Sequence, residues 1–170
     1  LDHSEFNLYL IHENLNQLKK ENKINSEIIP ILLSIQDRLN LENLFLKYKI
    51  NHVYHAAAYK HVPLLEENII EGIKNNNLGT KNLIELTKKY GVSKFILVST
   101  DKAVRPTNIM GATKRFSEML VQASADEHRS VNKTAYAIVR FGNVVNSSGS
   151  VIPLFSKQIK NGGPITVTHP

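Results

Sequence analysis

The chain has 170 residues, enough for one domain, since a domain of this size buries roughly two-thirds of the surface that its unfolded chain exposes. Its 42% hydrophobic and 21% charged residues are those of an ordinary soluble protein, and the absence of cysteine excludes disulfides and favours a reducing, cytoplasmic setting. The net charge of +6 comes from scattered lysines without stacking aromatics, so nucleic acid is not an expected partner. No run approaches the roughly 20 apolar residues of a membrane span.

The first third of the chain alternates strand and helix patterns. Residues 1–2 resemble the end of a strand, and Ser4 caps a helix with one apolar face formed by Leu8, Ile11, Leu15 and Leu18. A short buried strand is then predicted at 31–33, a helix at 39–48 and a further strand at 52–55.

The alternation continues to the last third. A long helical stretch ends at Tyr90, after which Gly91 suits a left-handed cap. Residues 95–98 form a wholly apolar strand, 112–127 a helix with Phe116, Met119, Leu120 and Ala123 at helical spacing, and 135–139 the next strand. Repeated alternation predicts an α/β fold with a doubly wound parallel sheet of the Rossmann type.

One expected feature of a nucleotide-binding sheet is missing. All eight glycines lie at Gly72 or later, so there is no G-x-G-x-x-G loop. We interpret the chain as starting after the first strand and its loop, because Asp2 then stands where an acidic residue holds the adenosine ribose. A solvated terminal Asp2 is the alternative, and so is a fold that binds no dinucleotide.

The residues with the clearest chemistry follow the apolar strand. Thr100, Asp101 and Lys102 place a hydroxyl, a carboxylate and an amine at the carboxyl end of a parallel strand, where ligands of open α/β sheets bind. Lys114 follows twelve residues later, one helical turn beyond Met110, and we expect it to reach the same crevice. On its own, the Asp101–Lys102 pair could equally be a surface ion pair.

Five motifs in order make the sequence resemble the polysaccharide-biosynthesis family of UDP-N-acetylglucosamine 4,6-dehydratases, which are extended short-chain dehydrogenases. The resemblance covers nearly the whole chain. The motifs lie at residues 55–63, 77–80, 99–114, 140–144 and 149–153. It implies that NAD oxidises carbon 4 of the sugar, that water is eliminated across carbons 5 and 6, and that the hydride returns to carbon 6.

In this resemblance Lys102 is the base at carbon 5 and Asp101 the acid for the leaving hydroxyl. Such roles need a lowered pKa at Lys102 and a raised pKa at Asp101. Lys114 resembles the lysine that holds the nicotinamide ribose. Met110 replaces the usual tyrosine, as in one branch of the family that is often carried on larger membrane-attached proteins. Oxidation at carbon 4 is then left to Thr100, to Lys114 through a water, or to Asp101.

The resemblance also implies cofactor and substrate contacts. Those with NAD are Asp2, His55, Ala56, Ala57, Ala58, Asn77, Ser99 and Lys114. Those with a UDP-N-acetylhexosamine are Lys60, Asn143, Ser150, Val151, Leu154, Thr166 and Val167. Residues 1–170 are accordingly expected to be an incomplete NAD-binding domain, with 143–170 leading into a substrate region that continues beyond the chain. No metal site is expected, because His55 and His61 have no further ligand nearby.

Two rival functions stay open. A nucleotide-sugar 4-epimerase shares the cofactor but does not need the Asp101–Lys102 pair, and a non-catalytic nucleotide-sugar sensor would have little use for two lysines and an Asp in one crevice. The helices at 78–86 and 116–123 resemble those that pair in homo-oligomers of this superfamily. A cytoplasmic location is expected, at the inner membrane in a full-length protein that attaches through segments outside this chain.

Overall fold

A computed structural model describes residues 1–127, 134–144 and 151–167 of the chain. A parallel sheet of three strands forms its centre, in the order β1 (His52–His55), β2 (Lys94–Thr100) and β3 (Ala135–Phe141). The register pairs His55 with Leu97 across β1 and β2, and Thr100 with Phe141 across β2 and β3. The three strands expected from the apolar runs are therefore confirmed, and β2 and β3 end side by side.

The prediction of a regular, buried strand at residues 31–33 was wrong. This segment is reduced to one parallel bridge between Asp2 and Leu32, closed by hydrogen bonds from Asp2 N to Ile31 O and from Leu33 N to Asp2 O. Leu32 is 57% exposed. A strand needs a ladder on at least one side, and only residues 1–2 are available to this segment among the described residues.

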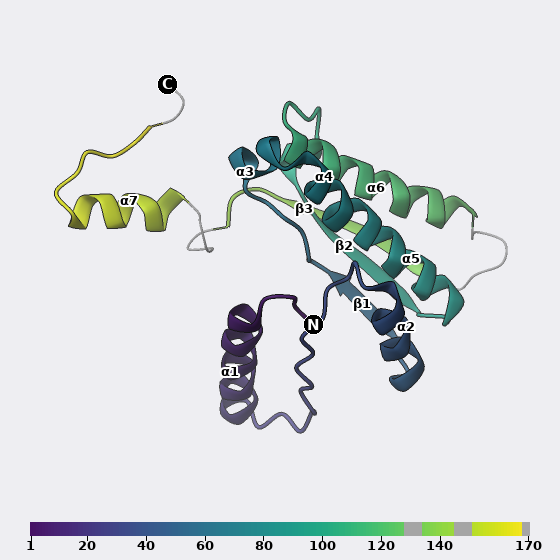
Figure 1. The fold of residues 1–170 in the computed structure, drawn as a ribbon. Helices are drawn as coiled ribbons and strands as arrows, with labels where there is room; N and C mark the ends of the chain where they lie inside the picture. Colours follow the sequence, from purple (N-terminus) through teal and green to yellow (C-terminus); the bar gives the residue numbers. More distant parts are fainter. Residues whose placement is uncertain (128–133, 145–150, 168–170) are drawn as a thin grey trace.

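Helices cover one face of the sheet (Figure 1). They are α2 (Arg38–Lys47), α3 (Val62–Glu67), α4 (Ile69–Ile73), the π-helix η1 (Lys74–Leu78), α5 (Gly79–Lys89) and α6 (Ile109–Glu127), with a 3₁₀ turn η2 (Asp101–Ala103) after β2. Phe95 and Leu97 point into the core below α5 and α6 with no exposed surface, whereas Ile96 and Val98 on the other side of β2 are partly exposed. The predicted glycine cap is also present, since Gly91 has φ 66°.

The buried face of α6 is mostly polar, and three of the apolar residues predicted at helical spacing, Phe116, Met119 and Ala123, lie on its outer side. Phe116 and Met119 are each 51% exposed and Ala123 is exposed. The side chains packed inward are Thr113, Lys114, Ser117, Glu118, Val121 and Ser124. The apolar stripe is therefore left on the surface, and the inner polar groups hydrogen-bond to neighbouring elements.

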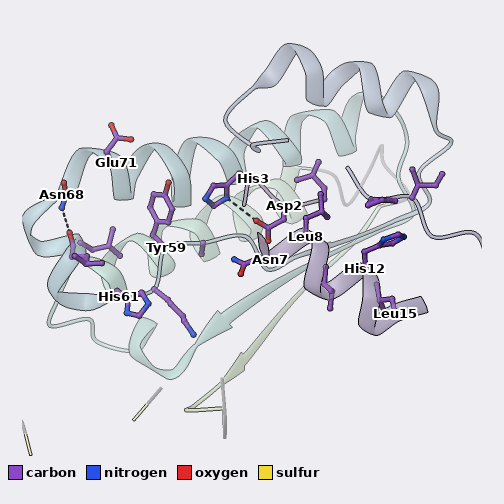
Figure 2. A pocket seen from close by; sticks show the side chains of 18 of the residues that line it. Asp2, His3, Asn7, Leu8, His12, Leu15, Tyr59, His61, Asn68 and Glu71 are labelled. Carbon is purple, nitrogen blue, oxygen red and sulfur yellow. Dashed lines mark hydrogen bonds and ion pairs between the residues drawn. The ribbon is translucent and has the colours of Figure 1, made fainter. Parts of the chain in front are cut away.

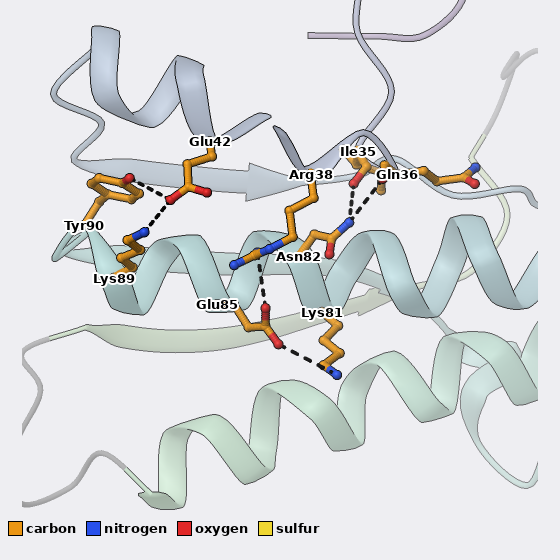
Figure 3. A network of polar contacts seen from close by, with 9 residues as sticks. All are labelled: Ile35, Gln36, Arg38, Glu42, Lys81, Asn82, Glu85, Lys89 and Tyr90. Atoms are coloured by element: carbon orange, nitrogen blue, oxygen red, sulfur yellow. Dashed lines mark hydrogen bonds and ion pairs between the residues drawn. The ribbon is translucent and has the colours of Figure 1, made fainter. Parts of the chain in front are cut away.

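Polar contacts fasten α2 to α5 (Figure 3). Arg38 pairs with Glu85 at 3.2 Å, and Glu42 accepts hydrogen bonds from Lys89 at 2.5 Å and Tyr90 at 2.8 Å. Because these side chains are largely at the surface, solvent screens their attraction, and the buried Leu41 and Phe45 of α2 supply most of the contact energy.

Two helices lie apart from the sheet in Figure 1, α1 (Glu5–Glu21) and α7 (Val151–Lys160). Ser4 caps α1 as expected, accepting from Asn7 N at 3.3 Å. Its apolar face packs little, since Ile11 is 49% and Leu18 50% exposed. Across the three described ranges, no helix has the length and apolar character that crossing a membrane requires.

Candidate functional site

A cleft of about 390 Å³ opens where β2 and β3 end. Nine of the predicted site residues line it: Ala56, Ala58, Lys60, Ser99, Thr100, Lys102, Met110, Lys114 and Asn143. They come from the loop after β1, the turn after β2, the first turns of α6 and the loop after β3. The expectation that residues far apart in sequence meet at this sheet edge agrees with their positions.

The turn after β2 carries the acid–base pair. Thr100 Oγ1 donates to Asp101 Oδ1 at 2.9 Å, and Lys102 Nζ donates to Asp101 Oδ1 and to Asn143 Oδ1, both at 3.2 Å. The hydrogen bonds from Thr100 and then Lys102 hold the pKa of Asp101 below its usual range, against the small effect of burial. The raised pKa expected for this carboxyl is thus not found, because Asp101 is exposed and well supplied with donors.

Burial lowers the pKa of Lys114. Its side chain lies almost fully inside the protein, at 8% exposed, and Nζ donates to the carbonyl of Val98 at 2.6 Å. Desolvation lowers its pKa from 10.5 to about 8, while the negative charge of Glu118 acts in the opposite direction. The amine is fixed beneath the end of β2, and it titrates close to neutral pH.

The first residues of α6 lie close to the turn after β2. Met110, in the position expected for a tyrosine, is 5% exposed and contributes an apolar wall to the cleft. A Cβ added to Gly111 would lie 2.4 Å from the carbonyl oxygen of Lys102. Glycine at position 111 therefore allows α6 to approach Lys102. The sequence analysis included Gly111 in a family motif but did not predict this close contact.

The loop after β1 is held by the π-helix. Asn76 pairs with both backbone groups of Tyr59, accepting from its N at 2.8 Å and donating to its O at 3.1 Å, and it also donates to Thr113 Oγ1 at 3.0 Å. Asn77 donates to the carbonyl of Thr113 at 2.7 Å, next to Lys114. An ordering role for Asn77 agrees with this contact, and Asn76 shares it.

His55 points away from the cleft and into the core. Its Nε2 lies 2.7 Å from Thr80 Oγ1, whose single hydrogen is donated to the carbonyl of Asn76, so Nε2 is the donor. Burial lowers the pKa of His55 to about 3, with a smaller contribution from the charge of Lys114. The ring is therefore neutral, and the predicted cofactor contact at this position would use its backbone.

A second cleft, of about 960 Å³, lies between α1, residues 28–30 and the loop after β1 (Figure 2). Asp2 lines it, with Oδ1 accepting from Ser4 N at 2.8 Å. Residues 58–61 belong to the walls of both clefts. The two clefts therefore lie on either side of a shared wall, with Asp2 in the first and Lys114 in the second.

Several predicted substrate contacts are not brought to either cleft. Thr166 is bonded to Gln158 of α7, Leu154 is 49% exposed and Val167 is 70% exposed. Ser150 lies outside the described residues, and Val151 is described only as the start of α7. Within the described ranges, no group of three or more metal-ligating side chains occurs.

Sequence reasoning missed the buried carboxylate behind the cleft, Glu118. Ser99 donates to it at 2.7 Å, and Arg140 forms a bidentate pair with it at 2.6 and 2.7 Å. Ser99, expected to contact the cofactor, thus turns its hydroxyl inward. The available signal was spacing: Glu118 lies four residues after Lys114, on the same helix face.

The parallel sheet with helices packed against it and a cleft at its carboxyl edge is a Rossmann-type α/β arrangement. A profile described as polysaccharide biosynthesis protein matches residues 1–170, and the chain belongs to this family. It is 49% identical over 170 residues to the capsular polysaccharide biosynthesis protein CapD of Staphylococcus aureus, covering all of this chain and 27% of CapD. It is also 46% identical over 121 residues to a UDP-glucose 4-epimerase of Rickettsia canadensis, covering 71% of this chain and 35% of that protein. The chain spans about a quarter to a third of these relatives.

The fold also matches solved structures. Pen from Bacillus thuringiensis superposes with a TM-score of 0.83 at 36% identity, over 99% of this chain and 50% of Pen. The dTDP-glucose 4,6-dehydratase DesIV of Streptomyces venezuelae, solved with NAD and TYD, gives a TM-score of 0.67 at 22% identity over 79% of this chain and 45% of DesIV, which shows the shared fold. Both the family and the α/β fold predicted from the sequence are confirmed.

Proposed function

We propose that this chain is the NAD-binding part of a UDP-N-acetylglucosamine 4,6-dehydratase that serves polysaccharide biosynthesis. The observation that carries the proposal is the turn Thr100–Lys102. The amine of Lys102 donates to the carboxylate of Asp101 and to Asn143, and Lys102 and Asn143 line the cleft that also contains Lys114. Residues 143–167 would lead into the substrate region of the intact protein.

In this proposal the two clefts that share residues 58–61 together hold the dinucleotide. Asp2 at one end is suited to a ribose diol, because a carboxylate accepts two hydroxyl hydrogens, and Lys114 at the other end can donate to a second ribose. The shared wall contains Ala58, whose small side chain allows a ligand to approach the backbone. When bound, NAD would supply the hydride acceptor for carbon 4 and the hydride donor for carbon 6.

In this proposal the residues of the turn after β2 carry out the elimination of water. In the proposed assignment, Lys102 in its neutral form takes the proton from carbon 5, which the ketone at carbon 4 has acidified, and Asp101 protonates the departing hydroxyl. The exposed, low-pKa state of Asp101 in this structure suits a carboxylate without substrate. A sugar covering the turn would remove water from Asp101 and raise its pKa toward the value that an acid needs.

Oxidation at carbon 4 needs a group to accept the hydroxyl proton, and Met110 has no such capacity. Thr100, Asp101 and Lys114 are the groups at hand. Of these, Lys114 has the pKa nearest neutral, about 8, so we favour Lys114 through a water.

A 4-epimerase is the second candidate, and the 46% identity to a UDP-glucose 4-epimerase over 121 residues favours it. An epimerase would use Lys114 and the cofactor but would lose no water. The two reactions therefore differ in whether Asp101 and Lys102 are needed.

The test is product formation from UDP-N-acetylglucosamine by the intact protein, with solvent deuterium at carbon 5 as a second readout. We expect the 4-keto-6-deoxy product from the wild type, and none from Lys102→Met. Lys94→Met is the matched control, because Lys94 is an exposed lysine at the opposite end of β2. Met110→Leu should cost little, since it keeps a similar apolar volume.

Three other results would contradict the proposal. A 4-epimer formed without water loss would establish the epimerase. Binding of NAD and nucleotide sugar without turnover would indicate the sensor. Wild-type turnover by Lys102→Met would remove the assigned base.

A further inference from the structure

A fully buried carboxylate lies directly behind the cleft. The side chain of Glu118 has no exposed surface, and it accepts hydrogen bonds from Ser99 at 2.7 Å, from Arg140 at 2.6 and 2.7 Å and from Arg115 at 3.0 Å. Burial raises the pKa of Glu118, but the hydrogen bonds from Arg140, Ser99 and Arg115 outweigh it and lower the pKa to about 2. Glu118 is therefore a stable anion inside the protein.

The donors come from the elements that carry the candidate catalytic groups. Ser99 immediately precedes Thr100 on β2, and Arg140 stands three residues before Asn143 near the end of β3. Glu118 itself lies one helical turn beyond Lys114 on α6. Neither Glu118 nor Arg140 is among the residues that line the cleft, so the cluster stands behind the reacting groups.

Stability alone does not account for this arrangement. A buried ion pair often adds no more stability than apolar side chains of the same volume, because desolvation offsets the attraction. A bidentate Arg–carboxylate pair does, however, fix the direction of approach of its two partners. The contact between Glu118 and Arg140 thus sets the distance and angle between α6 and β3, and the contact with Ser99 does the same for β2.

We propose that Glu118 is a positioning residue: its carboxylate joins the ends of β2 and β3 to α6, and so fixes Thr100–Lys102 and Asn143 relative to Lys114. The catalytic consequence rests on the proposed function, whereas the positioning itself does not. A second effect is electrostatic. The charge of Glu118 opposes the desolvation of Lys114, so its removal lowers the pKa of that amine further below 10.5.

The experiment compares the intact wild-type protein with Glu118→Gln, Glu118→Asp and Glu85→Gln. Glutamine keeps the shape of Glu118 and removes its charge, and aspartate keeps the charge. Glu85→Gln is the matched control, because Glu85 also pairs with an arginine, Arg38, but on α5 at the surface. Hydrogen exchange at residues 98–102 and 140–143 reports the positions of the two strand ends, and product formation against pH reports the chemistry.

For Glu118→Gln we expect faster exchange at both strand ends and a turnover number reduced about tenfold or more, with the substrate KM within about threefold of wild type. In the profile of turnover against pH, the slope assigned to the titration of Lys114 should move to lower pH in Glu118→Gln. In Glu118→Asp it should stay near its wild-type position. Glu85→Gln should match the wild type in all readouts. A merely structural Glu118 would not move this slope.

Unchanged exchange at both strand ends in Glu118→Gln would overturn the inference. If the wild type forms no dehydration product, the proposed function fails, but the exchange comparison still decides whether Glu118 fixes the two strands. Should Glu118→Gln fail to fold, Ser99→Ala removes one contact and leaves the charge paired. Ser99→Ala should then speed hydrogen exchange at residues 98–102 and leave exchange at 140–143 unchanged. Exchange at 98–102 equal to that of the wild type would contradict the inference.

Discussion

The contact between Gly111 and the turn after β2 allows a sharp test of how closely the site is built. In Gly111→Ala the added Cβ would lie 2.4 Å from the Lys102 carbonyl oxygen, so the two must separate by at least about 0.6 Å to reach the 3.0 Å limit of real Cβ contacts. The oxygen belongs to backbone and cannot rotate away as a side chain can. Because Lys102 is the proposed base, the displacement falls on the reacting amine, and a shift approaching 1 Å is sufficient for a loss of up to about 100-fold in turnover.

The effect on stability should be much smaller. Overpacking costs about 1–3 kcal/mol, and replacing glycine by alanine in a helix returns about 1 kcal/mol of it. Gly79→Ala is the matched control: its Cβ would meet Ile35 Cδ1 at 2.5 Å, the end of a flexible side chain that lines neither of the two clefts. We expect both variants to lose a similar amount of stability in urea titrations of the intact protein, and only Gly111→Ala to lose turnover. Turnover within twofold of the wild type for Gly111→Ala would refute this reasoning.

Three other predictions concern the cofactor, the assembly and pH. If Asp2 holds the adenosine ribose, the intact protein should bind NAD more tightly than NADP in calorimetric titrations, because a carboxylate repels a 2′-phosphate, and equal affinities would remove that assignment. The exposed stripe containing Phe116 on α6 should lie in a homo-oligomer interface, so that Phe116→Arg converts a dimer or larger assembly into a monomer in light scattering; a monomeric wild type would contradict this. The pKa of His55 is about 3 in the folded protein and 6.5 for an ordinary histidine, so between these values the unfolded state binds more protons and stability falls as pH decreases. Urea unfolding at pH 4.5 against pH 7 should show roughly 2–3 kcal/mol of this loss in the wild type and less in His55→Gln, and equal losses would show that His55 is not its source.

Local patterns were sufficient for the parts of the fold whose signals are local. The segments 52–55 and 95–98 are both strands, as predicted, because their β-branched, aromatic and apolar residues suit a pleated surface. The segment 31–33 has a similar composition and forms only a bridge, since a strand also needs partners that sequence does not reveal. The π-helix at Lys74–Leu78 was equally invisible, because it follows from the need to bury three consecutive asparagines rather than from helix propensity.

The side of α6 that packs inward shows a second limit of sequence reasoning. The spacing of Phe116 and Met119 predicted a helix but not which of its sides packs on the sheet, and the structure buries Ser117 and Glu118. Buried polar side chains need donors and acceptors to meet them, and two of the three residues that donate to Glu118, Ser99 and Arg140, stand on β2 and β3. A count of apolar residues along one helix carries no information about those partners.

The family motifs succeed where single-residue chemistry fails, because most of them are contact partners in one cleft. Gly111 presses on the carbonyl of Lys102, and a Cβ on Gly142 would lie 3.5 Å from Asp101 Oδ2. Asn143 accepts a hydrogen bond from Lys102 Nζ at 3.2 Å. An Asp–Lys pair alone would read as a surface ion pair, and both side chains are indeed partly open to solvent. This pair, however, has Gly111 and Gly142 close beside it, and Asn143 accepts a hydrogen bond from its amine, so the amine is held at the cleft. These contacts are the reason to place the elimination chemistry at the turn rather than at Met110.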